Sequence, residues 1–299
     1  MVMNTMMLRG CGTALVTPFR ADGAIDEDAL RRLVEWQIAS GVNFLVPCGS
    51  TGEAVTMTFD EQVRVVGITA EVADGRVRIV AGAGSNDTAK AILMSRALAK
   101  VGATHLLHVT PMYNKPPQRG MLAHFRAIAD SGNLPIILYN VPGRTAINLN
   151  AETTLMLAEH PKIAGIKEAS GDLAQIEQII KWQPAGFSTL SGDDALTRKV
   201  IALGGEGIIS VVSNATPRQM TDLTTAALAG DAATAEELEA KLMPWMRAAF
   251  IESNPIPAKA ALHMMGRIGP RLRLPLVELA PEFHDAVRDA LRTAGVVLK

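Results

Sequence analysis

This chain of 299 residues has few cysteines and almost no net charge. Its two cysteines, Cys11 and Cys48, are too few for a disulfide framework and are typical of a reducing compartment, so we expect a cytoplasmic protein. The formal net charge of -1 gives no reason to expect nucleic acid or an anionic membrane as a partner. No apolar run reaches the roughly 18 residues that span a bilayer, and Met1–Arg9 lacks an apolar stretch of signal-peptide length.

Motifs for metal ions and phosphates are missing as well. His105 and His108 are three residues apart on a predicted strand, so their side chains point to opposite faces and do not indicate a zinc site. Gly82-Ala83-Gly84 lacks the further glycine and the lysine of a phosphate loop. We therefore expect neither a bound metal ion nor a phosphate-bearing cofactor.

Short apolar runs alternate with longer amphipathic stretches along most of the chain. Apolar residues make up 48% of it, which is enough for a large core. The predicted strands are residues 11–16, 43–47, 77–81, 105–109, 135–139, 163–167, 187–190 and 207–211. Eight short, apolar strands indicate a parallel sheet buried on both faces, and they favour an α/β fold of the (β/α)8 TIM-barrel type over a doubly wound sheet.

Helical patterns fill the segments between these strands. Thr58 with Glu61 predicts a capping box for the second helix, and Asp87 predicts the N-cap of the third. Later helices are predicted at 118–131, 151–160, 173–182, 194–203 and 217–229, followed by 232–253, 256–265 and 281–294 without further strands. The sequence thus predicts a barrel over residues 1–229 and a C-terminal helical domain over residues 230–299.

The chain has only two tyrosines, and both lie beside polar residues at predicted strand ends. Tyr113 follows the fourth strand, Tyr139 ends the fifth, and Lys167 ends the sixth. The C-terminal strand ends of a (β/α)8 barrel share one rim, so we expect these side chains to meet there. A desolvated lysine loses its proton readily and can form a Schiff base with a ketone, while phenols transfer the protons.

Two further features of this rim suit carboxylates. Gly49–Glu53 follows the second strand and supplies the hydroxyls of Ser50 and Thr51. Arg144, just beyond the fifth strand, offers two parallel hydrogen bonds to a second carboxylate. Structural roles remain alternatives: Lys167 could pair with the neighbouring glutamate, the tyrosines could be packing residues, and the arginine could be solvated.

The sequence resembles the dihydrodipicolinate synthase and N-acetylneuraminate lyase superfamily over essentially its whole length. The matching motifs, in order, are residues 13–19, 49–53, 110–116, 139–145, 165–171, 191–194, 207–211 and 254–257. The resemblance implies that Lys167 forms a Schiff base with pyruvate and that no separate cofactor is needed. It also implies a proton relay of Tyr139, Ser50 and Tyr113, in which Tyr113 reaches in from a neighbouring subunit.

The resemblance also assigns substrate contacts. Thr51 and Ile209 match pyruvate contacts, Gly192 matches a glycine of the pocket wall, and Arg144 matches the residue that holds the carboxylate of aspartate semialdehyde. We therefore expect pyruvate and aspartate semialdehyde to condense to 4-hydroxy-tetrahydrodipicolinate, in diaminopimelate and lysine synthesis. Family members are commonly homotetramers built as pairs of tight dimers, and we expect the same here.

Some positions depart from the family pattern. Ser50 stands where many synthases have threonine, and the Ser-Thr pair also occurs in the lyases, so this motif does not separate the subfamilies. Lys90 replaces an acid that would hold the ammonium of an inhibiting lysine, so we expect weak lysine inhibition or none. Two alternatives remain open: a pyruvate aldolase acting on a sugar acid, and a barrel that serves only for binding or assembly.

Overall fold

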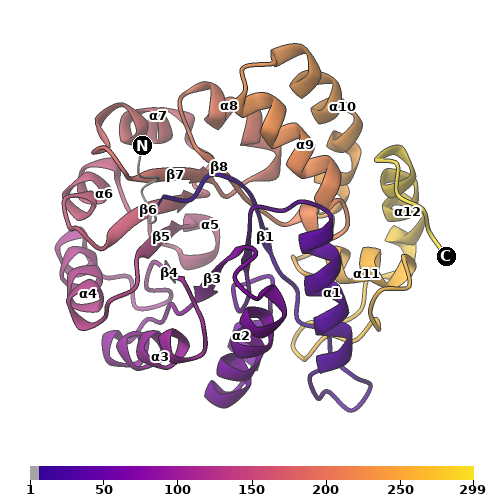
Figure 1. The fold of residues 1–299 in the computed structure, drawn as a ribbon, viewed down its shortest axis with the longest axis horizontal. Helices are drawn as coiled ribbons and strands as arrows, with labels where there is room; N and C mark the ends of the chain where they lie inside the picture. Colours follow the sequence, from indigo (N-terminus) through magenta and orange to yellow (C-terminus); the bar gives the residue numbers. More distant parts are fainter. Residues whose placement is uncertain (1–6) are drawn as a thin grey trace.

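A computed structural model describes residues 7–299 of the chain; residues 1–6, in the Met1–Arg9 segment discussed above, lie outside the described residues. Eight parallel strands form a closed barrel in chain order, with the last strand paired to the first (Figure 1). They are β1 Gly10–Ala14, β2 Phe44–Val46, β3 Arg78–Gly82, β4 His105–Val109, β5 Ile136–Asn140, β6 Ile163–Glu168, β7 Ser188–Ser191 and β8 Gly207–Ser210. The predicted (β/α)8 barrel is confirmed.

Closure of the barrel depends on a glycine pair. Gly10 of β1 lies opposite Gly207 of β8 in the strand register. A Cβ atom on Gly207 would lie only 2.0 Å from the carbonyl oxygen of Gly10, and the Gly207 φ of 140° suits glycine alone. The two strands can approach closely enough to pair because Gly207 has no side chain, whereas a Cβ atom on Gly10 would instead overlap the Asn43 side chain.

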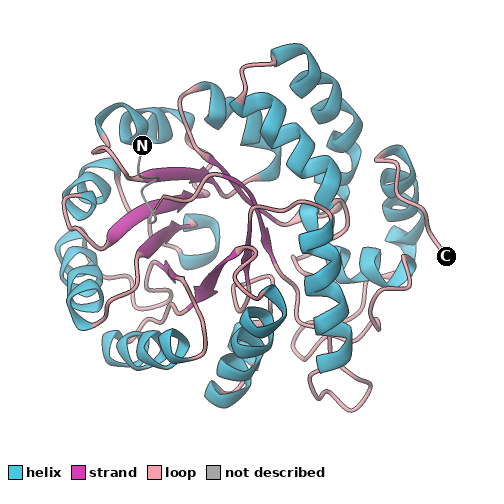
Figure 2. Cartoon of the chain, viewed as in Figure 1, coloured by secondary structure: helices cyan, strands magenta, loops and turns pink. Residues whose placement is uncertain are grey.

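Helices surround the barrel on its outside, as the cyan and magenta ribbons of Figure 2 show. The ring comprises α1 Glu27–Ala39, α2 Phe59–Ala73, α3 Thr88–Lys100, α4 Gln118–Ser131, α6 Ala151–Ala158, α7 Leu173–Trp182, α8 Thr197–Ala202 and α9 Pro217–Leu228. The short α5 Pro142–Thr145 lies inside this ring, just beyond the end of β5. Both predicted caps are confirmed: Thr58 and Glu61 form a reciprocal capping box, and the Asp87 side chain accepts hydrogen bonds at the start of α3.

The predicted helix at residues 194–203 is wrong in its first turn. Asp194–Leu196 forms a short 3-10 helix, and the α-helix begins only at Thr197. The Asp194 carboxylate accepts hydrogen bonds from the Ser210 hydroxyl and the Val211 amide, which ties this turn to the end of β8. Helix α5, a single turn after β5, was not predicted by the sequence pattern.

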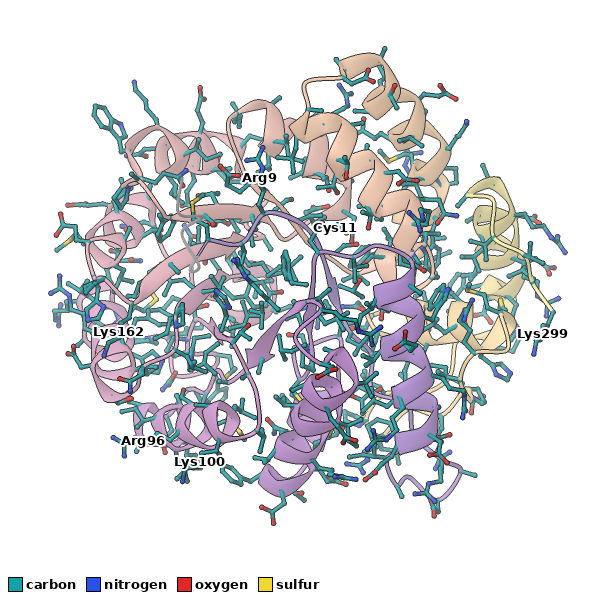
Figure 3. All side chains as sticks on the ribbon, in the orientation of Figure 1. Arg9, Cys11, Arg96, Lys100, Lys162 and Lys299 are labelled. Atoms are coloured by element: carbon teal, nitrogen blue, oxygen red, sulfur yellow. The ribbon has the colours of Figure 1, made fainter. Side chains whose placement is uncertain are left out.

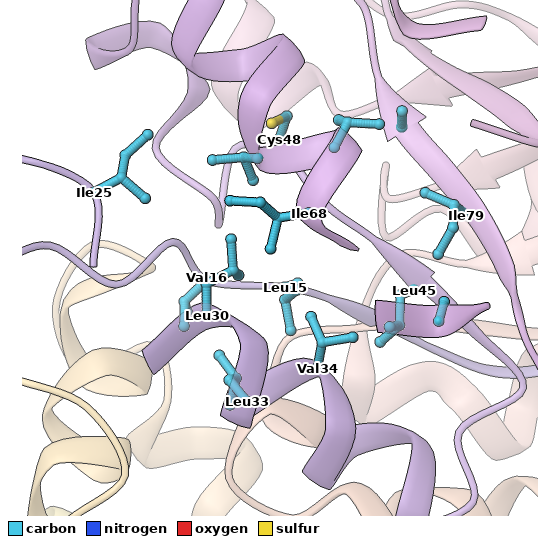
Figure 4. Packing of buried hydrophobic residues seen from close by; sticks show 14 of the residues in the cluster. Leu15, Val16, Ile25, Leu30, Leu33, Val34, Leu45, Cys48, Ile68 and Ile79 are labelled. Atoms are coloured by element: carbon cyan, nitrogen blue, oxygen red, sulfur yellow. The ribbon is translucent and has the colours of Figure 1, made fainter. Parts of the chain in front are cut away.

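Apolar side chains fill the space between the strands and the helical ring. Figure 4 shows one such cluster, in which Leu30, Leu33 and Val34 of α1 pack with Leu45 of β2 and Ile79 of β3. Full burial of a leucine, isoleucine or valine side chain contributes about 1.5–3 kcal/mol. The periodic apolar face of α1 therefore fixes this helix against the first three strands.

The C-terminal segment adds three α-helices, α10 Ala232–Ala248, α11 Ile256–Met264 and α12 His284–Thr293. Trp245 of α10 is fully buried and donates a hydrogen bond to the Val212 carbonyl oxygen, 3.1 Å away. The same core includes Cys11 of β1. On the opposite part of the molecule, the charged Arg96 is exposed on the outer side of α3 (Figure 3). The division into two domains at residue 230 stays a prediction.

No helix between residues 7 and 299 is both long and apolar enough to cross a membrane. This agrees with the absence of long apolar runs in the sequence.

Candidate active site

A cavity of about 200 Å³ opens at the C-terminal end of the barrel strands. It brings together six of the eight predicted site residues, which come from four different strand ends or the loops after them. They are Ser50, Thr51, Tyr139, Arg144, Lys167 and Gly192. These six residues therefore meet at one rim, as predicted, whereas Tyr113 does not line the cavity, and the roles assigned to all of them stay predictions.

Lys167 lies on β6 directly opposite Tyr139 of β5 in the strand register. The Lys167 side chain is almost fully buried, and its Nζ lies 4.4 Å from the centre of the Tyr139 ring. Burial lowers the pKa of Lys167 to about 8; the Asp194 carboxylate opposes this change, and the Arg144 cation adds to it. A substantial fraction of the amine is therefore neutral near pH 8.

The neighbouring glutamate is not the partner of Lys167. Glu168 points to the other face of the strand and accepts hydrogen bonds from Asn140, Ser170 and Gln175. Within residues 7–299, Lys167 forms no ion pair. The paired alternative is thus wrong, and the amine faces the cavity.

Tyr139 is buried beside this amine. Burial raises the pKa of its phenol to about 12, although the nearby Arg144 cation lowers it somewhat. The phenol therefore keeps its proton at neutral pH and can donate it. In the described part of the chain its hydroxyl makes no hydrogen bond to Ser50, although both residues line the cavity.

Tyr113 lies outside the cavity of its own chain. Its side chain is 90% exposed, and its backbone has a φ of 72°, which is rare for a residue with a Cβ atom. The single chain therefore does not bring Tyr113 to Tyr139. Its predicted action from a neighbouring subunit stays a prediction.

Asn254 joins the hydroxyl loop to the arginine. Its Nδ2 donates to Thr51 Oγ1 over 2.9 Å, and its backbone carbonyl oxygen accepts a hydrogen bond from Arg144 Nη2 over 3.1 Å. Phe250 also lines the cavity. Sequence reasoning noted the motif at 254–257 but assigned no role to Asn254, and it missed Phe250 altogether.

Gly192 and Ile209 occupy different positions relative to the cavity. A Cβ atom on Gly192 would lie 2.6 Å from the Ala169 Cβ and 3.2 Å from Lys167 Cε, so the wall has no room for a side chain there. Ile209 is fully buried in the barrel interior below the cavity, while Val211 lines the wall. A pyruvate contact by Ile209 stays a prediction.

Histidine, cysteine, aspartate and glutamate side chains form no group that could ligate a metal within residues 7–299. His108 is buried against Ser95 on the outer side of β4, and burial lowers its pKa to about 3. The functional groups that line the cavity are therefore an amine, a phenol, two hydroxyls, a guanidinium, the Asp193 carboxylate and the Asn254 amide.

Comparison with known proteins agrees with this inventory. Residues 7–294 match the dihydrodipicolinate synthetase family. A 4-hydroxy-tetrahydrodipicolinate synthase from Koribacter versatilis is 50% identical over 98% of both chains. One from Pseudomonas aeruginosa is 46% identical over 97% of this chain and 100% of its own.

Solved structures give the same result. A dihydrodipicolinate synthase from Acinetobacter baumannii, described as complexed with pyruvate, superimposes with a TM-score of 0.96 at 42% identity, over 97% of this chain and 100% of its own. The synthase from Aquifex aeolicus gives 0.95 at 39% identity, over 98% and 100%. The chain therefore belongs to the dihydrodipicolinate synthetase family.

Proposed function

We propose that this chain is a lyase that condenses pyruvate with L-aspartate 4-semialdehyde to give 4-hydroxy-tetrahydrodipicolinate, for diaminopimelate and lysine synthesis. The relatives that match it over nearly its full length carry the name of this activity. The main structural support for this chemistry is the buried Lys167 amine, which has a lowered pKa and lies in a cavity at the barrel rim.

The first half of the reaction uses this amine. Neutral Lys167 attacks the ketone carbon of pyruvate, and the resulting carbinolamine loses water to give a Schiff base. Loss of a proton from the pyruvate methyl group then gives a nucleophilic enamine, for which the imine nitrogen is the electron sink. The covalent intermediate on Lys167 supplies what a separate cofactor would provide, so none is required.

Protons must move at each of these steps. Tyr139 lies beside the amine and stays protonated at neutral pH because burial raises the pKa of its phenol. The hydroxyls of Ser50 and Thr51 line the same cavity, where they can accept and pass on protons or bind the pyruvate carboxylate. Tyr113 from a second copy of the chain would extend the relay towards solvent.

The second half requires recognition of another carboxylate. Arg144 lines the cavity with an exposed side chain, and its guanidinium suits the carboxylate of aspartate semialdehyde. The enamine carbon attacks the aldehyde carbon, whose oxygen becomes the hydroxyl group. The amino group of the bound product then attacks the imine carbon, closes the ring and releases the Lys167 amine.

Assembly and location form the finer part of this proposal. A homotetramer made of two tight dimers would bring Tyr113 of one copy to the cavity of another. Three exposed apolar side chains supply surface for such a contact: Val55 in the turn before α2, Phe59 at the start of α2, and Leu93 on α3. A cytoplasmic location fits the two buried, unpaired cysteines.

A substrate panel tests the proposed function. Pyruvate with aspartate semialdehyde should give rapid turnover, while retro-aldol cleavage of 2-keto-3-deoxy sugar acids and of N-acetylneuraminate should be slow. Faster cleavage of a sugar acid would favour the aldolase alternative. A chain that binds pyruvate without forming a borohydride-reducible adduct would favour the binding-module alternative.

A further inference from the structure

A buried ion pair holds the end of the hydroxyl loop Gly49–Glu53. The side chains of Glu53 and Lys259, on α11, are both fully buried. Lys259 Nζ donates to Glu53 Oε1 over 2.5 Å, and the backbone N–H of Arg273 donates to Glu53 Oε2 over 3.0 Å. Groups from the C-terminal segment therefore occupy both carboxylate oxygens.

An aromatic ring holds the cationic side of this pair. Lys259 Nζ lies 4.3 Å from the centre of the Phe19 ring, and the guanidinium of Arg273 lies 4.4 Å from the same centre. Cations are attracted to the face of an aromatic ring. Arg273 also donates two hydrogen bonds to the Glu61 carboxylate at the start of α2. The position of Glu53 is thus set from several elements at once.

Two more hydrogen bonds hold the same loop. Thr17 Oγ1 donates to the carbonyl oxygen of Gly52 over 2.8 Å, and Asn254 Nδ2 donates to Thr51 Oγ1 over 2.9 Å. Asn254 lies two residues before α11, so the segment that carries Lys259 reaches the loop twice. The Ser50 side chain lines the cavity, and its place depends on these flanking restraints.

The loop end has two features that do not favour stability. Glu53 has a φ of 56°, in the left-handed region that side chains with a Cβ atom disfavour. A buried ion pair is often no better for stability than an apolar pair of similar size. Unfavourable features of this kind persist where the surrounding structure holds them, and they cluster at functional sites.

We propose that Glu53 and Lys259 are positioning residues, whose buried pair fixes the loop so that the Ser50 and Thr51 hydroxyls face the Lys167 amine. The inference rests on the imine chemistry proposed above. Neither residue lines the cavity, so the pair acts through the two hydroxyls, on the pyruvate half of the reaction. Recognition of the second carboxylate should be affected less, because Arg144 has no hydrogen bond to Glu53 or Lys259 in the described residues and is connected to the loop only through Asn254.

The test removes both charges together, so that no unpaired buried charge remains. Glu53→Gln is combined with Lys259→Met, and the rate of imine formation is measured by borohydride trapping of the pyruvate adduct. Because small displacements of catalytic groups have large effects, we expect the rate to fall about tenfold to a hundredfold. The KM for pyruvate should rise by more than the KM for aspartate semialdehyde, because Arg144 is connected to the loop only through Asn254. Unchanged trapping in a folded double variant would overturn the proposal.

A matched control removes a different ion pair. Arg198 of α8 pairs with Glu239 of α10, away from the cavity. Arg198→Met with Glu239→Gln should leave both KM values and the trapping rate unchanged. If this control slowed trapping as much as the test pair does, the effect would belong to general destabilisation, and the positioning role would be rejected.

A second variant covers the case in which the double variant does not fold. Glu53→Asp keeps the charge but shortens the side chain, so the pair can persist only if the loop moves. A raised pyruvate KM with a near-parental unfolding temperature supports the proposal, and unaltered pyruvate kinetics overturn it. Borohydride trapping is first carried out on the parent protein. If the parent forms no adduct on Lys167, the proposed function fails and this inference fails with it. If parent and variants are trapped equally, only the positioning role is contradicted.

Discussion

The ammonium nitrogen of Lys167 lies 4.4 Å from the centre of the Tyr139 ring, and the two residues are direct neighbours in the pairing of β5 with β6. A rigid strand pair, rather than a loop, thus sets the distance between the reactive amine and the nearest phenol. The face of the ring attracts the protonated amine, whereas burial favours the neutral form. Burial is the largest cause of the lowered pKa of about 8, and the Asp194 carboxylate opposes it.

The pH dependence of imine formation should reflect this balance. The neutral fraction of Lys167 grows as the pH rises through about 8, so trapping of pyruvate by borohydride should accelerate between pH 6.5 and 9 and then level off. Lys167→Ala should abolish trapping while the fold stays intact. An adduct found by mass spectrometry on another residue would contradict the assignment.

Stability should change in the opposite sense from activity when this lysine is replaced. The ordinary lysine pKa of 10.5 applies to the unfolded chain, so below about pH 8 folding buries a full charge. That cost disappears between about pH 8 and 10.5, as the folded form loses its proton first. Lys167→Met should therefore raise the free energy of unfolding at pH 7 by on the order of 2 kcal/mol, and by less at pH 9.5. Equal urea midpoints for variant and parent at pH 7 would be contrary to this expectation.

The proposed relay predicts complementation between subunits. Co-expressed Lys167→Ala and Tyr113→Phe chains should form mixed oligomers in which one cavity holds Lys167, Tyr139 and a normal Tyr113 from its partner. Activity should exceed that of either variant alone. Lys167→Ala mixed with Tyr139→Phe is the control, because Tyr139 and Lys167 line the same cavity and no complete site can form. Equal activity of both mixtures would exclude action from a neighbouring subunit.

Arg144→Ala should separate the two substrates. Loss of a charge-assisted hydrogen bond to a carboxylate costs about 1.5–3 kcal/mol, which corresponds to about tenfold to a hundredfold in kcat/KM for aspartate semialdehyde. Imine formation with pyruvate should persist, with a modest shift because the cation also lowers the pKa of Lys167. Arg96→Ala, on the outer side of α3, is the control. If the use of both substrates fell equally, the role of Arg144 would be misassigned.

Lysine should inhibit this enzyme weakly or not at all, with half-inhibition above about 1 mM, an affinity near -4 kcal/mol. Lys90 lies exposed near the start of α3, where it would repel the ammonium group of the inhibitor. Lys90→Glu should increase the sensitivity to lysine, whereas Lys100→Glu, at the other end of the helix, should not. Half-inhibition well below 1 mM in the parent would refute this interpretation of Lys90.

Local sequence patterns predicted most of the barrel but not all of its rim. The predicted bounds of α4 and α7 agree with the structure, because each is an amphipathic run with clear ends. Strand ends differ by a residue or two, because ladder hydrogen bonds to neighbouring strands decide where pairing stops. The break before α8 escaped prediction because Asp194 is fixed by Ser210, a partner on another strand.

Site residues were predictable where a strand end carried them. Lys167, Tyr139 and Arg144 were found because parallel strands in a barrel end at one rim. The contacts of Asn254 were not, since its partner Thr51 is 203 residues away and no local pattern connects them. The depth of Ile209 below the cavity also depends on barrel geometry, which the strand pattern alone does not contain.

The placement of Lys167 and Arg144 on different kinds of element bears on how such enzymes diverge. The amine belongs to β6, buried in the ladder, whereas the guanidinium belongs to α5, a single turn that ends in solvent. Insertions or substitutions in that turn can change which aldehyde is accepted without moving the covalent step. A lineage built on this barrel is therefore free to exchange its second substrate while inheriting the same nucleophilic enamine.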